Sequence, residues 1–251
     1  TAAGLLILDE SPAGTDPVAT GETAQSPDGT ASATADLATV FANTTTTSTA
    51  GDTVTTFGTD GEGSVAYALT LSQTSSQSGD ILSGIYALDN SDTSSTDGDG
   101  IGQGDQLILV DGSTLSGGTA GVIYGVLSGE TDAANSYFTI SNSGSSVTFS
   151  QQQNVWHDDT SLFDEGGPNA DSARLIVTNG SLGLKQTVTD ADGDSASSTA
   201  DLSGSADSSI GSVFSIQDDG PASSTSSSAA SVLSTAAGLL ILDESPAGTD
   251  P

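Results

Sequence analysis

TAAGLLILDESPAGTDP spans residues 1–17, and the same stretch returns at residues 235–251. A repeat of this length does not arise from shared residue propensities, so Thr235 begins a second copy of a unit with a period of 234 residues. Repetition at a fixed period is typical of tandem architectures, in which each unit packs its own core. The sequence therefore shows one full unit followed by the first strand of the next.

The stretch between the two copies predicts the domain boundary. Residues 222–235, ASSTSSSAASVLST, are small, polar and almost uncharged, as is typical of linkers. We predict one domain over residues 1–221, a connector over 222–235, and the first strand of the next identical unit over 236–251.

The repeated stretch itself contains a strand pattern, GLLILDE (4–10), and the pattern continues along the chain. In SVAYALTL (64–71), every second residue from Val65 to Leu71 is large and apolar, which is typical of a half-buried strand. Gly, Asn, Asp and Ser turns separate such segments, so we predict an all-β fold, an antiparallel β-sandwich of the Ig-like, adhesin-extender type repeated in tandem. Only ADLATVFA (35–42) resembles a short helix. The other predicted strands are 80–88, 105–112, 121–127, 137–141, 146–151, 173–179, 183–190 and 212–218.

The charge of the chain is strongly one-sided. It has 33 acidic residues, two basic residues and one histidine, with a formal net charge of −31. Nucleic acids and anionic lipids are held by Lys and Arg, so this composition excludes a nucleic-acid partner and predicts no membrane insertion. Self-repulsion opposes a compact state unless cations bind, and divalent metal is the expected cation. Disorder in the absence of metal is the alternative.

The strongest local motif is TDADGDSAS, in which Asp190, Asp192 and Asp194 alternate around Gly193. Carboxylates at this spacing in a tight turn can converge on Ca²⁺, which accepts six to eight oxygen ligands. The motif resembles the first half of an EF-hand loop, but Ser195 stands where that loop needs Gly, and both flanks have strand character. The alternative interpretation is a solvated Asp-Gly hairpin turn.

A second acidic stretch, LDNSDTSSTDGDGIGQGDQL, contains Asp97, Asp99 and Asp105, together with Asp89 and Asp92. Its Gly-Asp spacing partly matches the calcium-binding nonapeptide of β-rolls, although one imperfect copy cannot build a roll. We treat a calcium site and a plain surface loop as equally open interpretations.

Two further acidic pairs stand at the ends of the predicted domain. Asp9 and Glu10 begin it, and Asp218 and Asp219 end it, so the pairs come close when units are joined in series. They could share an ion that stiffens the junction, or they could keep strand edges soluble.

Catalytic motifs are not evident in the sequence. His157 lies in NVWHDDTS beside Trp156, and no GxSxG elbow or phosphate-binding loop accompanies it. We predict that the chain is not an enzyme, that Trp156 is a core or interface aromatic, and that His157 is exposed. The sequence has no cysteine, which excludes disulfides and thiolate-bound metals.

The landmarks occur in a fixed order: LLILDES (5–11), the acidic stretch within 83–110, NVWHDD (154–159), QTVTDADGDSAS (186–197) and FSIQDDGP (214–221). In this order they resemble the repeat domain of giant RTX-type adhesins, which type I secretion systems export from Gram-negative bacteria. The resemblance implies an extracellular or cell-surface location, a role in attachment or biofilm formation, and a calcium-stiffened β domain that acts as a spacer. It maps the family's acidic turn onto Asp190, Asp192 and Asp194.

Two classes of function remain open on this basis. The first is a structural extender whose partners are neighbouring identical repeats. The second is a module that binds glycan, ice or another surface at each repeat, which exposed aromatic residues in a groove would favour. We favour the extender, and the sequence leaves open whether the units form one covalent chain or exchange the LLILDE strand between subunits.

Overall fold

The structure is a computed structural model, and it divides the chain into a unit over Thr1–Gly220 and a second unit over Pro221–Pro251. The division lies beside the predicted boundary. The predicted connector at 222–235 and the predicted second copy of the first strand at 236–251 lie outside the described residues. The structure describes residues 6–12, 22–25, 31–41, 46–47, 53–54, 56–58, 60–73, 79–158, 172–204 and 213–218.

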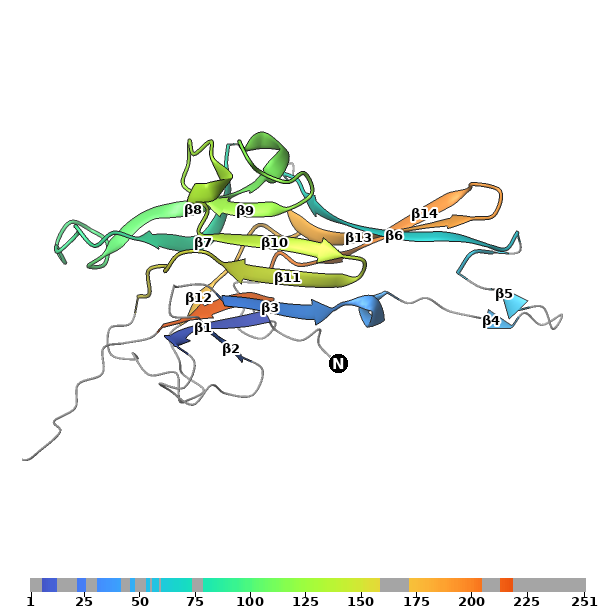
Figure 1. The fold of residues 1–251 in the computed structure, drawn as a ribbon, viewed down its shortest axis with the longest axis horizontal. Helices are drawn as coiled ribbons and strands as arrows, with labels where there is room; N and C mark the ends of the chain where they lie inside the picture. The colour runs from blue at the N-terminus through green and yellow to red at the C-terminus, as the bar shows by residue number, and fades with distance from the viewer. Residues whose placement is uncertain are drawn as a thin grey trace, which may run out of the picture. The chain divides into compact units, whose positions relative to one another are not determined.

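The described part of the chain is all-β, and its helical elements are three single 3-10 turns (Figure 1). No helix among these residues is long and apolar enough to cross a membrane. The elements in chain order are β1 (Leu6–Pro12), β2 (Glu22–Gln25), β3 (Ala31–Asp36), η1 (Ala38–Val40), β4 (Thr46–Thr47), β5 (Thr53–Val54), β6 (Glu62–Leu71), β7 (Ile81–Leu88), β8 (Gln103–Asp111), η2 (Gly112–Thr114), β9 (Ile123–Val126), η3 (Ala133–Asn135), β10 (Phe138–Ser143), β11 (Ser146–Gln151), β12 (Ser172–Arg174), β13 (Leu182–Asp190), β14 (Ser195–Asp201) and β15 (Phe214–Gln217).

The first and last strands of the unit lie side by side. The four-stranded sheet has the order β12-β15-β1-β2, and β1 runs parallel to both β15 and β2. Leu6 and Leu8 of β1 alternate inward and are buried. This sheet is mixed, because β12 pairs antiparallel with β15. The chain between β1 and β15 runs through the whole unit, and so long a connection permits their parallel pairing.

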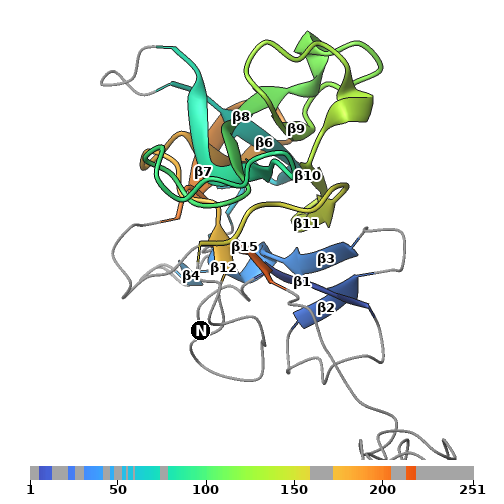
Figure 2. The ribbon, with the colours of Figure 1, turned by 90° about the vertical axis from the view of Figure 1, so that its left-hand side faces the viewer.

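The six-stranded sheet packs on the four-stranded sheet and is antiparallel throughout, with the order β3-β11-β10-β9-β8-β7 (Figure 2). Phe149 of β11 is fully buried between Phe138 of β10 and Phe214 of β15. Its ring centroid lies 5.5 Å from that of Phe138 and 5.2 Å from that of Phe214. These aromatic contacts join the two sheets in one hydrophobic core, which confirms the sandwich prediction.

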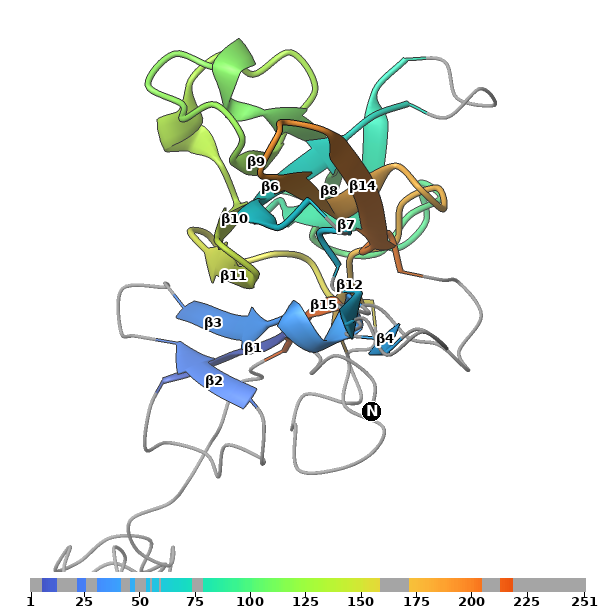
Figure 3. The same ribbon diagram turned by 90° about the vertical axis from the view of Figure 1, so that its right-hand side faces the viewer.

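A third sheet carries the acidic hairpin turn. It has the order β14-β13-β6, with both pairs antiparallel, and β13 places Leu182, Leu184 and Val188 on a buried face. β14 is exposed along most of its length. In Figure 3, β6 and β14 lie on the opposite side of β10 and β11 from β1 and β2. A separate two-stranded sheet pairs β4 with β5.

The predicted strand at 173–179 is wrong beyond Arg174. The backbone N–H groups of Leu175, Ile176 and Val177 donate to Phe214, Ser83 and Ser203 respectively, and these acceptors belong to three different parts of the fold. Because its hydrogen bonds go in three directions, this segment connects the sheets and extends none of them. Gly84 of β7, with φ +81°, lets it approach, since a Cβ there would lie only 3.2 Å from the Arg174 carbonyl oxygen.

The predicted helix at 35–42 is also wrong. β3 continues to Asp36, and only the 3-10 turn η1 follows it. One carboxylate oxygen of Asp36 accepts hydrogen bonds from the Ala38 N–H and the Ser145 hydroxyl, which ends the strand and fixes the turn. The remaining predicted strands are present, most of them with bounds shifted by one to three residues.

Candidate metal centres

The turn between β13 and β14 brings two of its three predicted ligands together. Ligand oxygens of Asp190 and Asp192 lie within 4.8 Å of one another and of Asp60, which precedes β6. One oxygen of Asp190 accepts hydrogen bonds from the backbone N–H groups of Gly193 (3.1 Å) and Asp194 (2.8 Å), so the turn holds this carboxylate in place. The side chain of Asp194 is not part of the group.

Hydrogen bonds and mutual repulsion set the electrostatics of this group. Hydrogen bonding to the Asp192 side chain, followed by the backbone N–H groups of the turn, lowers the pKa of Asp190. Two carboxyl groups in contact need a proton or a cation between them, because their ionised forms repel. Asp60 and Asp192 are exposed and Asp190 is half-buried, so an ion could enter from solvent.

The second acidic stretch folds as a series of turns that gather a different triad from the one predicted. Ligand oxygens of Asp92, Asp97 and Asp99 lie within 4.8 Å of one another. Asp92 is fixed by the N–H of Ser94 on one oxygen and the N–H of Gly102 on the other, both at 3.0 Å. Asp105 lies on β8 with its side chain exposed and is not part of this group.

The carboxyl groups of Asp97 and Asp99 are also in direct contact. Their mutual hydrogen bond lowers the pKa of Asp97 and raises that of Asp99, and the charges of Asp97 and Asp92 contribute to the second shift. A triad of this kind offers the hard oxygen ligands that Ca²⁺ prefers. Asp60 and Asp92 are the two members that the sequence did not assign as ligands.

The acidic residues at the two ends of the unit meet within one unit, so no second unit is needed to join them. In the parallel register, Leu8 pairs with Ile216 and Asp9 with Gln217, which places Glu10 beside Asp218 as the next residues along. Ligand atoms of Glu10, Asp218 and His157 lie within 4.8 Å of one another. The side chain of Asp9 and the whole of Asp219 lie outside the described residues.

His157 is buried, so the prediction of an exposed histidine is wrong. Its side chain is 5 % exposed, and its Nε2 lies 3.8 Å from Glu10 Oε2. Burial lowers the pKa of His157, and the negative charges of Asp218 and Asp158 oppose this shift. The residue is drawn inward because the segment after β11 packs against β7, with the Trp156 N–H donating to the Tyr86 carbonyl.

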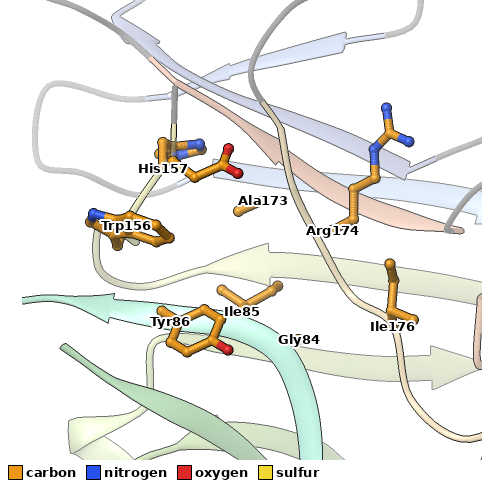
Figure 4. Close-up of a pocket in the computed structure, with 9 residues that line it drawn as sticks. Gly84, Ile85, Tyr86, Trp156, His157, Ala173, Arg174 and Ile176 are labelled. Carbon is orange, nitrogen blue, oxygen red and sulfur yellow. The ribbon is translucent and has the colours of Figure 1, made fainter. Parts of the chain in front are cut away.

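Trp156 lines an open groove of about 250 Å³ (Figure 4). Its ring meets that of Tyr86 edge to face at 5.9 Å, and its Nε1–H donates to the Ile101 carbonyl at 3.0 Å. Gly100 leaves the space for this ring, since a side chain there would collide with it. Arg174 and His157 line the same groove.

One comparison with known proteins gives a match. The family model described as Domain of unknown function (DUF5801) matches residues 5–203, which include β1 to β14 and both exposed acidic triads. No curated protein and no solved structure matches the chain.

Proposed function

The chain belongs to the DUF5801 family, and we propose that it is a structural spacer of a repetitive cell-surface or secreted protein, stiffened by calcium. The observation that carries this proposal is the position of the repeated stretch in the fold. Its strand, β1, is a central strand that lies between β15 and β2 and buries Leu6 and Leu8 in the core.

The burial of β1 supports a role for the second copy of its sequence. A unit without this strand would expose β15 and the core residues beneath it, so each unit in a series needs one copy of its own. Residues 235–251 supply the same sequence to the next unit. A uniform array of such domains performs the same mechanical task at each position, which suits a stalk or filament that holds a distal adhesive tip.

Calcium is the proposed stiffening ion. The two exposed triads, Asp60/Asp190/Asp192 and Asp92/Asp97/Asp99, present only carboxylate oxygens to solvent. The Asp60/Asp190/Asp192 triad joins two segments that are separate in sequence, and the Asp92/Asp97/Asp99 triad lies within one long loop. An ion bound at either triad would restrict the motion of the segments that carry its ligands. Extracellular calcium would support folding of a chain whose formal charge of −31 otherwise opposes compaction.

The spacer proposal predicts that length is additive. We expect chains of one, two and four 234-residue periods to gain a constant increment of maximum dimension per period in calcium, measured by small-angle X-ray scattering. Their masses in denaturant and in buffer should agree, because a covalent spacer needs no exchange of strands between chains. A dimension that does not increase with the number of periods, or assembly of single-period chains into long polymers, would contradict a covalent spacer.

A binding module is the second candidate, and the Tyr86–Trp156 groove is the observation that favours it. Partly exposed aromatic rings beside Arg174 are suited to stacking on a sugar ring. For a spacer we expect no retention on a glycan array. Retention that falls at least about tenfold in Trp156→Ala, an effect of the size expected for one buried aromatic contact, would favour the binding module instead.

A further inference from the structure

A third group of ligands, Glu10, His157 and Asp218, has features that the exposed acidic triads lack. Among the described residues, four buried side-chain atoms have no hydrogen-bond partner: both ring nitrogens of His157, Gln151 Oε1 and Gln217 Oε1. Three of the four belong to this region, the two nitrogens of His157 and Gln151 Oε1, since Gln151 contacts Glu10. Buried polar atoms without partners are costly, and native proteins rarely leave several of them together.

The imidazole of His157 is the main anomaly. A neutral imidazole has one N–H donor and one nitrogen acceptor, and here both are buried and unpaired. The 3.8 Å between Nε2 and Glu10 Oε2 is too long for a hydrogen bond. It is close to the separation of about 3.4 Å between two ligand atoms that share a tetrahedral Zn²⁺ at the usual bond lengths of about 2.0–2.2 Å.

The carboxylate of Glu10 is already oriented for such a role. Its Oε1 accepts hydrogen bonds from Gln151 Nε2 at 2.6 Å and from the Val155 N–H at 3.2 Å, and Oε2 is directed toward His157. Outer hydrogen bonds of this kind hold ligating carboxylates in metal sites. Asp218, half-buried, directly follows β15, and the parallel register that pairs Asp9 with Gln217 puts it next to Glu10.

Charge and ligand chemistry identify the class of ion. Glu10 is buried and Asp218 half-buried, and beside the buried imidazole their two negative charges would be balanced by a divalent cation. Burial lowers the pKa of His157, which favours the neutral ring that binds metal, while the charges of Asp218 and Asp158 oppose this shift. Imidazole nitrogen is a poor ligand for Ca²⁺, which takes oxygen, and a good one for Zn²⁺ and related first-row ions.

We propose that Glu10, His157 and Asp218 form a binding site for a borderline divalent cation of the Zn²⁺ class. The ion would tie the start of the unit, the segment after β11 and the end of the unit to one point. It would hold β1 and β15 together just beyond their last paired residues, Asp9 and Gln217. The site is separate from the calcium triads and does not rest on the spacer function.

The chain offers a direct probe, because His157 is its only histidine and it contains no cysteine. We expect one equivalent of Zn²⁺, added to metal-free full chain labelled with ¹⁵N-histidine, to shift the ring-nitrogen resonances, and excess Ca²⁺ to leave them unchanged. Saturating Zn²⁺ at about a hundred times Kd should raise Tm by about 5–10 °C. Unchanged ring resonances would overturn the proposal without any variant being needed.

Variants distinguish a site with three ligands from adventitious Zn²⁺ binding through His157 alone. His157→Gln, Glu10→Gln and Asp218→Asn should each weaken Zn²⁺ binding at least about tenfold in calorimetry, since even outer-sphere changes cost this much. Asp99→Asn, in an exposed triad, is the matched control and should leave Zn²⁺ affinity unchanged. If Glu10→Gln and Asp218→Asn bind Zn²⁺ as tightly as the wild type, the three-ligand site is wrong. If calcium does not raise the Tm of the wild type while Zn²⁺ still binds, only the calcium proposal is refuted.

Discussion

Chelation of calcium is expected to lower the melting temperature of the chain by about 10–20 °C. An ion that binds only the folded state adds about 2.7 kcal/mol at a hundred times its Kd, and the two exposed triads are the two candidate sites. For a domain of this size each kcal/mol shifts Tm by about 2–4 °C. The measurement is circular dichroism melting in millimolar calcium and in excess chelator, and Mg²⁺ should restore little of the loss.

Substitutions inside and outside the triads are the controls for this experiment. Asp60→Asn and Asp192→Asn should each reduce the calcium-dependent gain in Tm, because both carboxylates belong to one triad. Asp194→Asn and Asp105→Asn should not reduce it, because their side chains lie outside the triads. Equal melting temperatures in calcium and in chelator would mean that the acidic turns are only solvated loops.

Truncation of Phe149 should cause the largest loss of stability from a single substitution. We expect Phe149→Ala to lower the free energy of unfolding by about 3–5 kcal/mol, a large part of the roughly 5–15 kcal/mol that holds a typical domain together. The ring is fully buried and contacts Phe138 and Phe214, so its removal leaves a cavity between the two main sheets. Urea denaturation in calcium measures the effect.

Val65→Ala is the matched control for this substitution. Val65 is large and apolar but 41 % exposed on β6, so its truncation should change stability by less than about 1 kcal/mol. Comparable losses in the two variants would contradict a core centred on the β10, β11 and β15 aromatic residues.

The strands that could be predicted are those with large side chains in alternation. β10 buries Phe138 and Ile140 in this way and β11 buries Val147 and Phe149, and their alternation is visible in the sequence. β3 was missed because its buried residues, Ala31 and Ala33, are too small to stand out. The parallel pairing of β1 with β15 could not be predicted, because it depends on two segments at opposite ends of the unit.

The candidate sites also combine ligands that are close in sequence with ligands that only tertiary structure brings together. Asp190 and Asp192 share one turn, so their spacing was sufficient to predict them. Asp60 joins them only because β6 pairs with β13, with Glu62 opposite Asp190. Glu10 was visible in one respect, since it continues the inward alternation of Leu6 and Leu8. Its approach to His157 depends on tertiary packing that no local pattern records.

Calcium is proposed to stiffen a covalent spacer, and a chain of two 234-residue periods tests this most directly. Small-angle X-ray scattering in millimolar calcium should give a maximum dimension close to twice that of a single period, with a narrow distribution of conformations. Excess chelator should broaden that distribution and change the radius of gyration, and calcium should reverse the change. Scattering curves that coincide in calcium and in chelator would contradict the account.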